Sequence, residues 1–273
     1  MKYIMETERL RFRKISDDDF SNLKKIISDK ETMKYYPKPY DDEGVNKWIN
    51  WCKDCYKKYG FGLWAIELKD NTFIGDCGIT KQDIDGDIVF EIGYHFNKKY
   101  WHNGYASEAA KASKKWFFNN TPHKEVYSYM NIDNLASRKV AINNEMTFVK
   151  DYHKDNEHLV VYKITKDEYI NNLSLKEKVY KYLTEIPKGK VVTYGQIGKH
   201  LGNKKMCRAI GNILHVNPDP INQPCFKVVN AKGELAKNFG DGINVQAKRL
   251  KGDGVEVINY KVDLNKYQWK EDI

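Results

Sequence analysis

The sequence predicts an α/β (α+β) chain of two domains, in which a mostly antiparallel sheet flanked by helices precedes a small helical domain with a helix-turn-helix. Segments with strand-like and helix-like hydrophobic periods alternate over residues 1–168. A polar stretch at residues 165–174 interrupts that pattern. Residues 174–273 then show short helical patterns separated by proline and glycine. These observations place the domain boundary between residues 168 and 174.

The first domain is expected to begin with a strand, because residues 8–15 alternate charged and apolar side chains. Residues 16–19, Ser-Asp-Asp-Asp, are suited to cap a helix that runs to about residue 28. An amphipathic helix is expected over residues 45–52. Further strands are expected at residues 62–68, 71–79, 88–96, 126–130 and 159–164, and further helices at residues 105–119 and 136–144.

The second domain is expected to begin with a helix over residues 175–186, which Pro187 ends. Thr193 is placed to cap a short helix over residues 194–201. Gly202 marks a turn, and a second helix is expected over about residues 205–215. A short helix, a turn that contains glycine and a second helix are the pattern of a helix-turn-helix.

The net charge of +9 is concentrated in the second domain. Residues 174–273 hold 18 Lys and Arg against 10 Asp and Glu, which gives +8. Residues 1–173 hold 28 against 27, which gives +1. A polyanionic partner is therefore expected for the second domain and not for the first.

The sequence favours a reduced, cytoplasmic location without a membrane partner. Five scattered cysteines do not form a disulfide framework. No apolar run approaches the ~20 residues that span a bilayer, and the first residues lack the apolar core of a signal peptide. Cys52 and Cys55 have the spacing of half a zinc site, but such a site needs two further ligands and the first domain offers only Cys77, so we expect no metal.

The loop at residues 100–109 has the chemistry to bind a phosphate. Gly104 lacks the side chain that would block a ligand, and N–H groups at the start of a helix can donate to phosphate oxygens. This loop and three other segments resemble the GNAT acetyltransferases, and in particular the branch that acetylates ribosomal-protein N-termini. The other segments are residues 6–13, 90–94 and 131–137.

The resemblance implies the GNAT mixed sheet flanked by helices and an acetyl-CoA-dependent N-acetyltransferase that acts on an unidentified amine or protein N-terminus. Asn131 and Ser137 would lie near the pantetheine or the thiol of the cofactor. The amine must lose a proton before it attacks the thioester, and Glu91 is our candidate for the base. The alternative for Glu91 is a structural carboxylate paired with Arg or Lys. The residues expected at the pyrophosphate are Trp101, His102, Asn103, Gly104, Tyr105, Ala106 and Ser107.

Residues 186–197, 207–212 and 217–230 resemble the DNA-binding domain of the O6-alkylguanine-DNA alkyltransferases, and residues 254–269 are more similar to the alkyltransferase-like proteins. The resemblance implies binding in the minor groove of double-stranded DNA and rotation of an alkylated guanine out of the duplex. Arg208 would enter the base stack, and Tyr194 would displace the phosphate of the target. The small residues Ala209 and Gly211 would let the second helix approach the groove closely.

Cys225 matches the reactive cysteine of that family, but its neighbours differ. Alkyl transfer needs a thiolate, which the family generates through a histidine next in sequence and a glutamate. Here the next residue is Phe226, and Asp253 stands at the glutamate position. Lys227 stands where the family has an arginine, and we count it among the DNA-binding residues.

The missing histidine favours a sensor that flips O6-alkylguanine without repairing it. The alternative is an active methylated-DNA–protein-cysteine methyltransferase that uses Cys225, with the first domain as an accessory or scaffold. For the whole chain, two classes stay open: an acetyltransferase that its second domain places on DNA, and a lesion sensor whose first domain is a scaffold.

Overall fold

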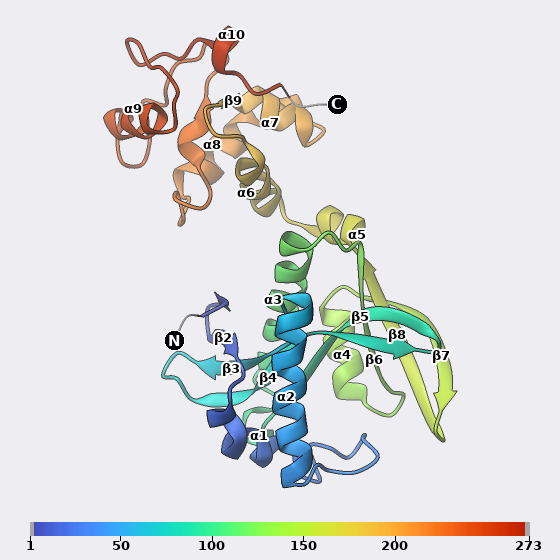
Figure 1. The fold of residues 1–273 in the computed structure, drawn as a ribbon. Helices are drawn as coiled ribbons and strands as arrows, with labels where there is room; N and C mark the ends of the chain where they lie inside the picture. The colour runs from blue at the N-terminus through green and yellow to red at the C-terminus, as the bar shows by residue number, and fades with distance from the viewer. Residues whose placement is uncertain (1–2, 271–273) are drawn as a thin grey trace. The chain divides into compact units, whose positions relative to one another are not determined.

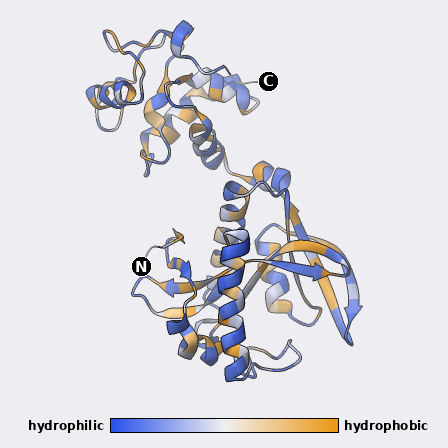
Figure 2. Cartoon of the chain, in the orientation of Figure 1, coloured by the Kyte–Doolittle hydropathy of each residue, from blue (hydrophilic) through white to orange (hydrophobic). Residues whose placement is uncertain are grey.

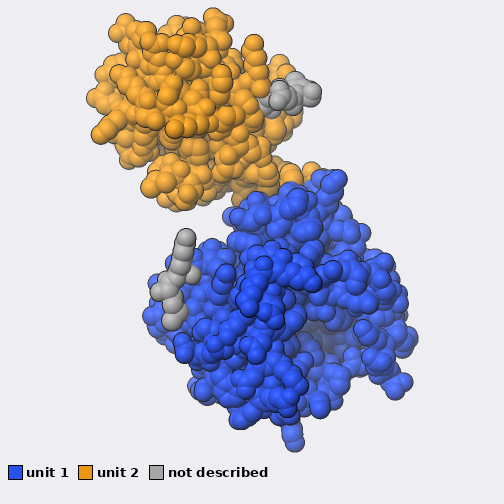
Figure 3. Space-filling model, viewed as in Figure 1, with its two compact units in different colours: residues 1–169 blue, residues 170–273 orange. Residues whose placement is uncertain are grey.

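The computed structural model describes residues 3–270 and divides into two compact units, residues 1–169 and 170–273 (Figure 3). The division falls inside helix α5 (Lys166–Asn172), in the polar stretch between the two expected domains. No helix in the described part of the chain is both long and apolar enough to cross a membrane. Residues 3–270 also contain no group of three or more His, Cys, Asp or Glu side chains that could hold a metal ion.

The first unit contains a mixed eight-stranded sheet in the order β1-β2-β3-β4-β5-β6-β8-β7, which confirms the predicted fold class (Figure 1). Its neighbouring strands are antiparallel except for β5 and β6. The strands are β1 (Met5–Glu6), β2 (Leu10–Lys14), β3 (Leu63–Leu68), β4 (Phe73–Ile84), β5 (Asp87–Phe96), β6 (Glu125–Asn131), β7 (Thr147–Lys154) and β8 (Glu157–Thr165). The helices are α1 (Phe20–Ile27), α2 (Asp42–Tyr59), α3 (Tyr105–Asn120) and α4 (Leu135–Asn143), followed by α5.

The β4–β5 pair is the longest ladder of the sheet, with ten residue pairs from Gly75 opposite Phe96 to Ile84 opposite Asp87. On its other side, β5 is joined to β6 by a single pair, Glu91 opposite Tyr127. β6 pairs instead with β8 along its whole length. The two strands therefore part beyond Glu91, and this parting interrupts the middle of the sheet.

Helices α2 and α3 cover opposite faces of the sheet. Trp48 of α2 donates its indole N–H to Asp76 of β4 at 3.2 Å. The next residue of β4, Cys77, contacts Ser113 of α3 at 3.5 Å. Successive residues of a strand point to opposite faces, so these two contacts assign one helix to each face.

Helix α2 is longer than the predicted helix over residues 45–52. The prediction was too short because charged residues interrupt the apolar stripe of this helix. Val45, Ile49, Cys52 and Tyr56 are buried at helical spacing, and the face turned to the viewer is largely hydrophilic (Figure 2). Asp41 caps the helix by accepting from the Gly44 N–H at 2.8 Å.

Strand β7 was not predicted. It lies at the edge of the sheet, and most of its side chains, including Phe148, are exposed. An edge strand with little burial lacks the apolar alternation that identifies a strand in a sequence.

A buried ionic cluster joins the first strands to the start of α1. The Arg13 guanidinium donates two hydrogen bonds to Asp19 and one to Glu67, each of 2.7 Å. All three residues are buried. A buried cation with two carboxylates is stable only while every member is present.

The second unit begins with α6 (Leu175–Glu185), which Ser174 and Glu177 cap reciprocally. Helix α7 (Tyr194–His200), a turn at Gly202, one 3-10 turn (Lys204–Met206) and α8 (Cys207–His215) follow. Thr193 accepts from the Gln196 N–H at 3.1 Å and caps α7. The remaining elements are β9 (Val192–Thr193), the 3-10 turn Cys225–Lys227, β10 (Val228–Val229), α9 (Ile243–Gly252) and α10 (Leu264–Tyr267).

Two apolar clusters stabilise the second unit, and the parallel pair of β9 and β10 lies between them. Val192 and Val228 belong to the cluster of α6, α7 and α8. Their neighbours Val191 and Val229 belong to the cluster that includes Leu250 of α9. The sequence did not predict α9 or α10.

The buried cluster of the first unit gives a prediction about stability. Arg13→Met should lower the free energy of unfolding of that unit by roughly 3–5 kcal/mol, because Asp19 and Glu67 would remain buried without their cation. Urea unfolding followed by tryptophan fluorescence measures this, since five of the six tryptophans lie in residues 1–169. Lys34→Met, which removes an exposed ion pair with Glu31, is the control and should leave the free energy of unfolding nearly unchanged. An equal, small effect of both changes would contradict the structural role of Arg13.

Candidate functional site

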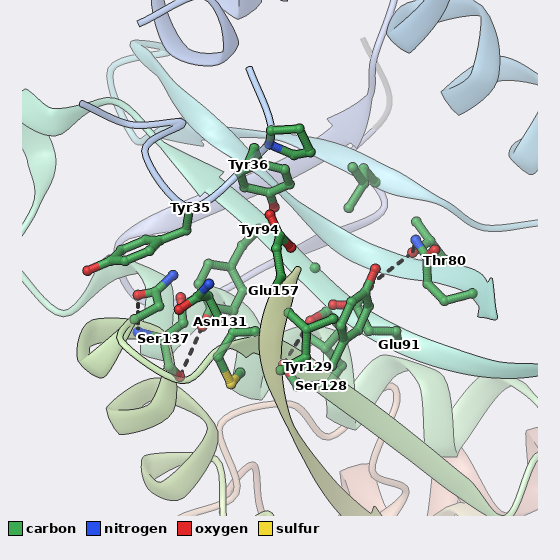
Figure 4. A pocket seen from close by; sticks show the side chains of 18 of the residues that line it. Tyr35, Tyr36, Thr80, Glu91, Tyr94, Ser128, Tyr129, Asn131, Ser137 and Glu157 are labelled. Carbon is green, nitrogen blue, oxygen red and sulfur yellow. Dashed lines mark hydrogen bonds between the residues drawn. The ribbon is translucent and has the colours of Figure 1, made fainter. Parts of the chain in front are cut away.

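A cavity of about 640 Å³ lies where β5 and β6 part (Figure 4). Residues 91–94 of β5 and residues 128–131 of β6 form part of its wall. Glu91 and Tyr94 are three residues apart on one strand, so their side chains leave it on opposite faces. Both nevertheless line the cavity. The cavity therefore reaches both faces of the sheet.

Glu91 is the buried carboxylate of this cavity, with 8% of its surface exposed. Thr80, opposite on β4, donates its hydroxyl to Glu91 Oε2 at 3.2 Å. Burial raises the pKa of Glu91 to about 7, although the hydrogen bond from Thr80 and the nearby His95 act in the other direction. Within residues 3–270, the Glu91 carboxylate forms no ion pair with Arg or Lys. A carboxylate in this state can exchange protons near neutral pH.

The loop before α3 ends at Gly104, whose φ of +77° lies in the left-handed region. The first hydrogen bond of the helix joins the Glu108 N–H to the Gly104 carbonyl at 3.0 Å. The N–H groups of residues 105–107 precede that bond, so the helix itself gives them no acceptor. Three such donors at the positive end of a 16-residue helix fit a phosphate or pyrophosphate.

Side chains within the loop hold its backbone in place. Trp101 donates its indole N–H to the Phe96 carbonyl at 2.7 Å. Asn103 donates to the Trp101 carbonyl at 2.9 Å. His102 is exposed and has a φ of +63°. Trp101 and Asn103 thus shape the loop, while residues 105–107 supply the N–H donors.

Asn131 and Ser137 both line the cavity. Asn131 ends β6 and accepts from the Asp133 N–H at 3.0 Å. Asn134 caps α4 by accepting from the Ser137 N–H at 3.1 Å. The Tyr94 hydroxyl donates to the Ser137 carbonyl at 3.3 Å, which joins α4 to β5.

In the second unit, α8 presents a free cation beside a small residue. Arg208 and Ala209 are exposed in the first turn of α8. The Arg208 side chain forms no hydrogen bond or ion pair within residues 3–270. Gly211 lies beside the ring of Tyr194, since a Cβ on Gly211 would be 3.9 Å from Tyr194 Cε1. Gly211 of α8 and the Tyr194 ring of α7 are thus neighbours at van der Waals distance.

Cys225 is buried behind these helices, with 6% of its surface exposed. It starts a 3-10 turn after Pro224, and β10 follows directly. Because β10 pairs with β9, which leads into α7, the turn is held beside Tyr194. Burial raises the pKa of Tyr194, and the nearby Cys225 adds to this effect.

Residues 9–147, about half of the chain, match the sequence model of the acetyltransferase (GNAT) domain. The chain belongs to the GNAT acetyltransferases. It is 36% identical over 158 residues to the uncharacterized protein YkkB of Bacillus subtilis, which covers 57% of this chain and 92% of that protein. The crystal structure of a GNAT-family acetyltransferase from Bacillus anthracis matches with a TM-score of 0.52 and 27% identity, over 60% of this chain and 99% of that one.

Residues 174–255 match the model of the 6-O-methylguanine DNA methyltransferase DNA-binding domain. Over 100 residues the chain is 36% identical to alkyltransferase-like protein 1 of Schizosaccharomyces pombe, which covers 34% of this chain and 92% of that protein. The chain is therefore a GNAT acetyltransferase domain fused to an alkyltransferase-like DNA-binding domain.

The structure brings some of the predicted site residues together and leaves others apart. Glu91, Asn131 and Ser137 share the cavity of the GNAT domain, whereas residues 101–107 are outside its described lining. In the alkyltransferase-like domain, Tyr194 lies close to both Gly211 and Cys225.

Lys227 is a correction to the predicted DNA contacts, because its ammonium is turned into the domain. It is 5% exposed and donates to the carbonyls of Ile186 and Pro187 at 3.2 and 3.0 Å. It also pairs with Asp253 at 3.2 Å, and Asp253 accepts from the Gly189 N–H at 2.8 Å. These contacts give Lys227 a structural role and engage the carboxylate that would complete a relay to Cys225.

Arg9 and Glu108 hold the loop of the GNAT domain, and the sequence did not single them out. Arg9 donates to the Asn103 carbonyl at 2.9 Å and to Glu108 at 2.6 Å. Its guanidinium also lies 4.6 Å from the centroid of the Tyr105 ring. The two residues are 99 positions apart in sequence, so no local pattern relates them.

The free donors beyond Gly104 give a prediction about cofactor binding. Gly104→Trp should abolish binding of acetyl-CoA, and Gly104→Ala should weaken it at least about tenfold, because a side chain strains the left-handed backbone and occupies the approach to the N–H groups. Calorimetric titration measures both. Gly86→Ala, at a φ of +86° in the β4–β5 turn, carries the same backbone strain and should leave affinity unchanged. Unchanged affinity in both Gly104 variants would refute the assignment of the loop.

Proposed function

We propose that residues 1–168 form an acetyl-CoA-dependent N-acetyltransferase in which Glu91 is the general base. The observation that supports this most strongly is a buried carboxylate with a pKa of about 7 in a cavity that reaches both faces of the sheet. An acceptor amine can approach on the Glu91 face while the acyl donor approaches on the face of Tyr94 and α4. The acceptor is a small amine or a protein N-terminus.

Different residues of this chain would bind the cofactor and transfer the proton. The N–H groups of residues 105–107 would bind the pyrophosphate, and Arg9 and Glu108 would fix their geometry. Asn131 and Ser137 would lie along the remainder of the cofactor. Glu91 would accept a proton from the substrate ammonium, which frees the nitrogen lone pair for attack on the thioester.

The raised pKa of Glu91 predicts the pH dependence of acetylation. A base must be ionised to accept a proton, so kcat/KM should rise with pH through about 7. Glu91→Gln should lose this rise and lower kcat by roughly 10²–10⁴-fold. The assay measures release of CoA thiol from about pH 5.5 to about pH 9, a range that spans the Glu91 pKa. The substrate is the best acceptor from a panel of alkyl amines, arylalkyl amines and peptides with a free N-terminus.

The matched control is Glu125→Gln, which removes a carboxylate that pairs with Lys163 on β8. It should keep both the rate and the pH profile. If kcat/KM of the Glu91→Gln variant still rises with pH near the Glu91 pKa of about 7, another group is the base.

We also propose that residues 174–273 bind double-stranded DNA and rotate O6-alkylguanine out of the duplex as a sensor. Three features support this: a net charge of +8 in these residues, the exposed, unpaired Arg208 on α8, and the position of Tyr194 beside Gly211 and Cys225. Arg208 would fill the space that the flipped base leaves in the stack. Cys225 would lie at the pocket that receives the base.

Recognition is favoured over repair by the surroundings of Cys225. Phe226 is apolar and packs into the cluster with Leu250, whereas Cys225 belongs to the cluster of α6 and α8. Asp253 is engaged by Lys227 and Gly189. No proton acceptor of the family type is therefore next to the thiol in the described structure. The second candidate, a methyltransferase that uses Cys225, rests on the presence of that cysteine.

Arg208 should determine lesion affinity. Arg208→Ala should weaken binding to a duplex with one O6-methylguanine by roughly 1–3 kcal/mol, because the vacated stack would have no occupant. Fluorescence anisotropy at fixed salt measures the loss. Lys248→Ala removes the same charge from the exposed face of α9 and should have a smaller effect. If both substitutions weaken binding equally, Arg208 contributes only charge.

Cys225 should remain unmodified after contact with the lesion. Intact-mass spectrometry of the full chain, incubated with a stoichiometric O6-methylguanine duplex, should show no added methyl group, because the thiol lacks a proton acceptor. An unmethylated duplex sets the baseline. A stoichiometric methyl group on Cys225 would establish repair and refute the sensor.

A further inference from the structure

A chain of three hydrogen-bonded side chains runs from the interior of the GNAT domain to the cavity. Asp76 Oδ1 and His95 Nδ1 are 2.8 Å apart, and His95 Nε2 is 2.7 Å from the Tyr36 hydroxyl. Asp76 is fully buried and His95 is 7% exposed. Tyr36 lines the cavity and is 41% exposed as a residue (Figure 4), but burial of its hydroxyl, with a smaller contribution from Glu91, holds the pKa of Tyr36 well above its usual value, so the phenol is neutral at rest. This row of hydrogen-bonded side chains thus begins at a buried carboxylate and ends at a phenol that lines the cavity.

The partners of Asp76 determine the direction of these hydrogen bonds. Its carboxylate lies against the His95 backbone N–H at 3.0 Å and the Trp48 indole N–H at 3.2 Å, which can only donate. An accepting carboxylate places the imidazole proton on Nδ1, so Nε2 of the neutral ring is an acceptor. The Tyr36 O–H then donates to Nε2. Its oxygen lone pairs are left facing the cavity.

The β4–β5 ladder places this chain next to Glu91. Asp76 is opposite His95, and Thr80 is opposite Glu91, on the same face of the sheet. Gly78 and Gly93 are the pair between them, so no side chain separates the two polar pairs. A Cβ on Gly93 would lie 3.2 Å from Glu91 Oε2, which shows that the carboxylate leans over Gly93 toward His95.

We propose that Tyr36 is a second proton-transfer residue of the acetyl-transfer site, and that His95 and Asp76 position it and store the proton in transit. The proposal rests on the acetyltransferase function proposed above and adds a role that Glu91 does not fill. Acylation of an ammonium requires two deprotonations of nitrogen and one protonation of sulfur. One carboxylate accepts only one of those protons at a time.

The proton balance follows from this division. Glu91 takes the first proton from the ammonium and later releases it to water. The nitrogen lone pair then forms the C–N bond to the acetyl carbon, and the nitrogen gives its second proton to the Tyr36 oxygen while Tyr36 passes its own proton to His95 Nε2. The C–S bond breaks with its electron pair on sulfur. His95 returns the proton through Tyr36 to sulfur, which yields the amide, the free thiol and the original relay.

Tyr36→Phe tests the proposal because it keeps the ring and removes only the hydroxyl. With saturating acetyl-CoA and the best acceptor amine from the panel, kcat should fall on the order of 10²-fold, while the KM for acetyl-CoA stays unchanged. Tyr127→Phe is the matched control, since its hydroxyl bonds Glu125 outside the cavity. It should retain the native kcat. Native kcat in Tyr36→Phe would overturn the proposal.

His95→Gln distinguishes a relay from a structural contact. In the native background it should lower kcat about as much as Tyr36→Phe does, and in the Tyr36→Phe background it should cause no further loss, because residues that act as one unit are not additive. A multiplicative further loss in the double variant would show that His95 acts independently of Tyr36, and it would overturn the relay.

A spectroscopic measurement is independent of the acceptor. Ring ¹⁵N chemical shifts of His95 in the full chain should show a protonated Nδ1 and an acceptor Nε2, and Tyr36→Phe should shift the Nε2 signal. A protonated Nε2 in the resting protein would reverse the direction of the relay and overturn the proposal.

The relay and the proposed base can fail separately. If Glu91→Gln loses activity while Tyr36→Phe does not, the proposed base stands and the relay fails. If the protein turns over no amine in the panel, both the proposed acetyltransferase function and the relay are contradicted.

Discussion

The β4–β5 ladder is the constraint on which the acetyl-transfer site depends. Its register fixes Asp76 opposite His95 and Thr80 opposite Glu91, with two glycines between these pairs. Cross-strand neighbours of this kind lie about 4.5–5.5 Å apart at Cβ, so polar partners are in reach without rearrangement. A slip of β5 by one residue would send His95 and Glu91 to the face opposite Asp76 and Thr80. Beyond Glu91, β5 no longer pairs with β6, because β6 pairs with β8 instead. One strand therefore supplies the polar ladder and one wall of the cavity.

The alkyltransferase-like domain contains a different buried polar arrangement, built on an ion pair between Lys227 and Asp253. The contact of Lys227 with Asp253 lies in the interior, together with two backbone carbonyls. A buried cation requires this set of acceptors. The Asp253 carboxylate is thereby engaged by Lys227 and by the Gly189 N–H. Arg208, on the exposed side of α8, is a cation without an ion pair within residues 3–270, which fits the proposed DNA-binding surface.

Much of this architecture could be predicted from local sequence patterns, because buried strands and capped helices have short-range signatures. Residues 88–96 are rich enough in β-branched and aromatic side chains to predict β5, and Thr193 correctly marks the start of α7. β7 was missed because an exposed edge strand has no apolar pattern. Glu91, Asn131 and Ser137 were selected by resemblance, and their shared cavity depends on the parting of two strands. Arg9 with Glu108, and Tyr36 with His95 and Asp76, depend on contacts between distant segments. The inward direction of Lys227 likewise required the fold, because an isolated lysine in a sequence is usually solvated.

Backbone hydrogen–deuterium exchange of the full chain, with and without acetyl-CoA, tests the central claim most directly. The claim is that the cofactor binds across the start of α3 and the parting of β5 and β6. Exchange should slow at the amides of residues 105–107 and in the segments 92–94 and 129–131, and it should stay unchanged in α7 and α8. Unchanged exchange at residues 105–107 in the presence of saturating acetyl-CoA would contradict the account.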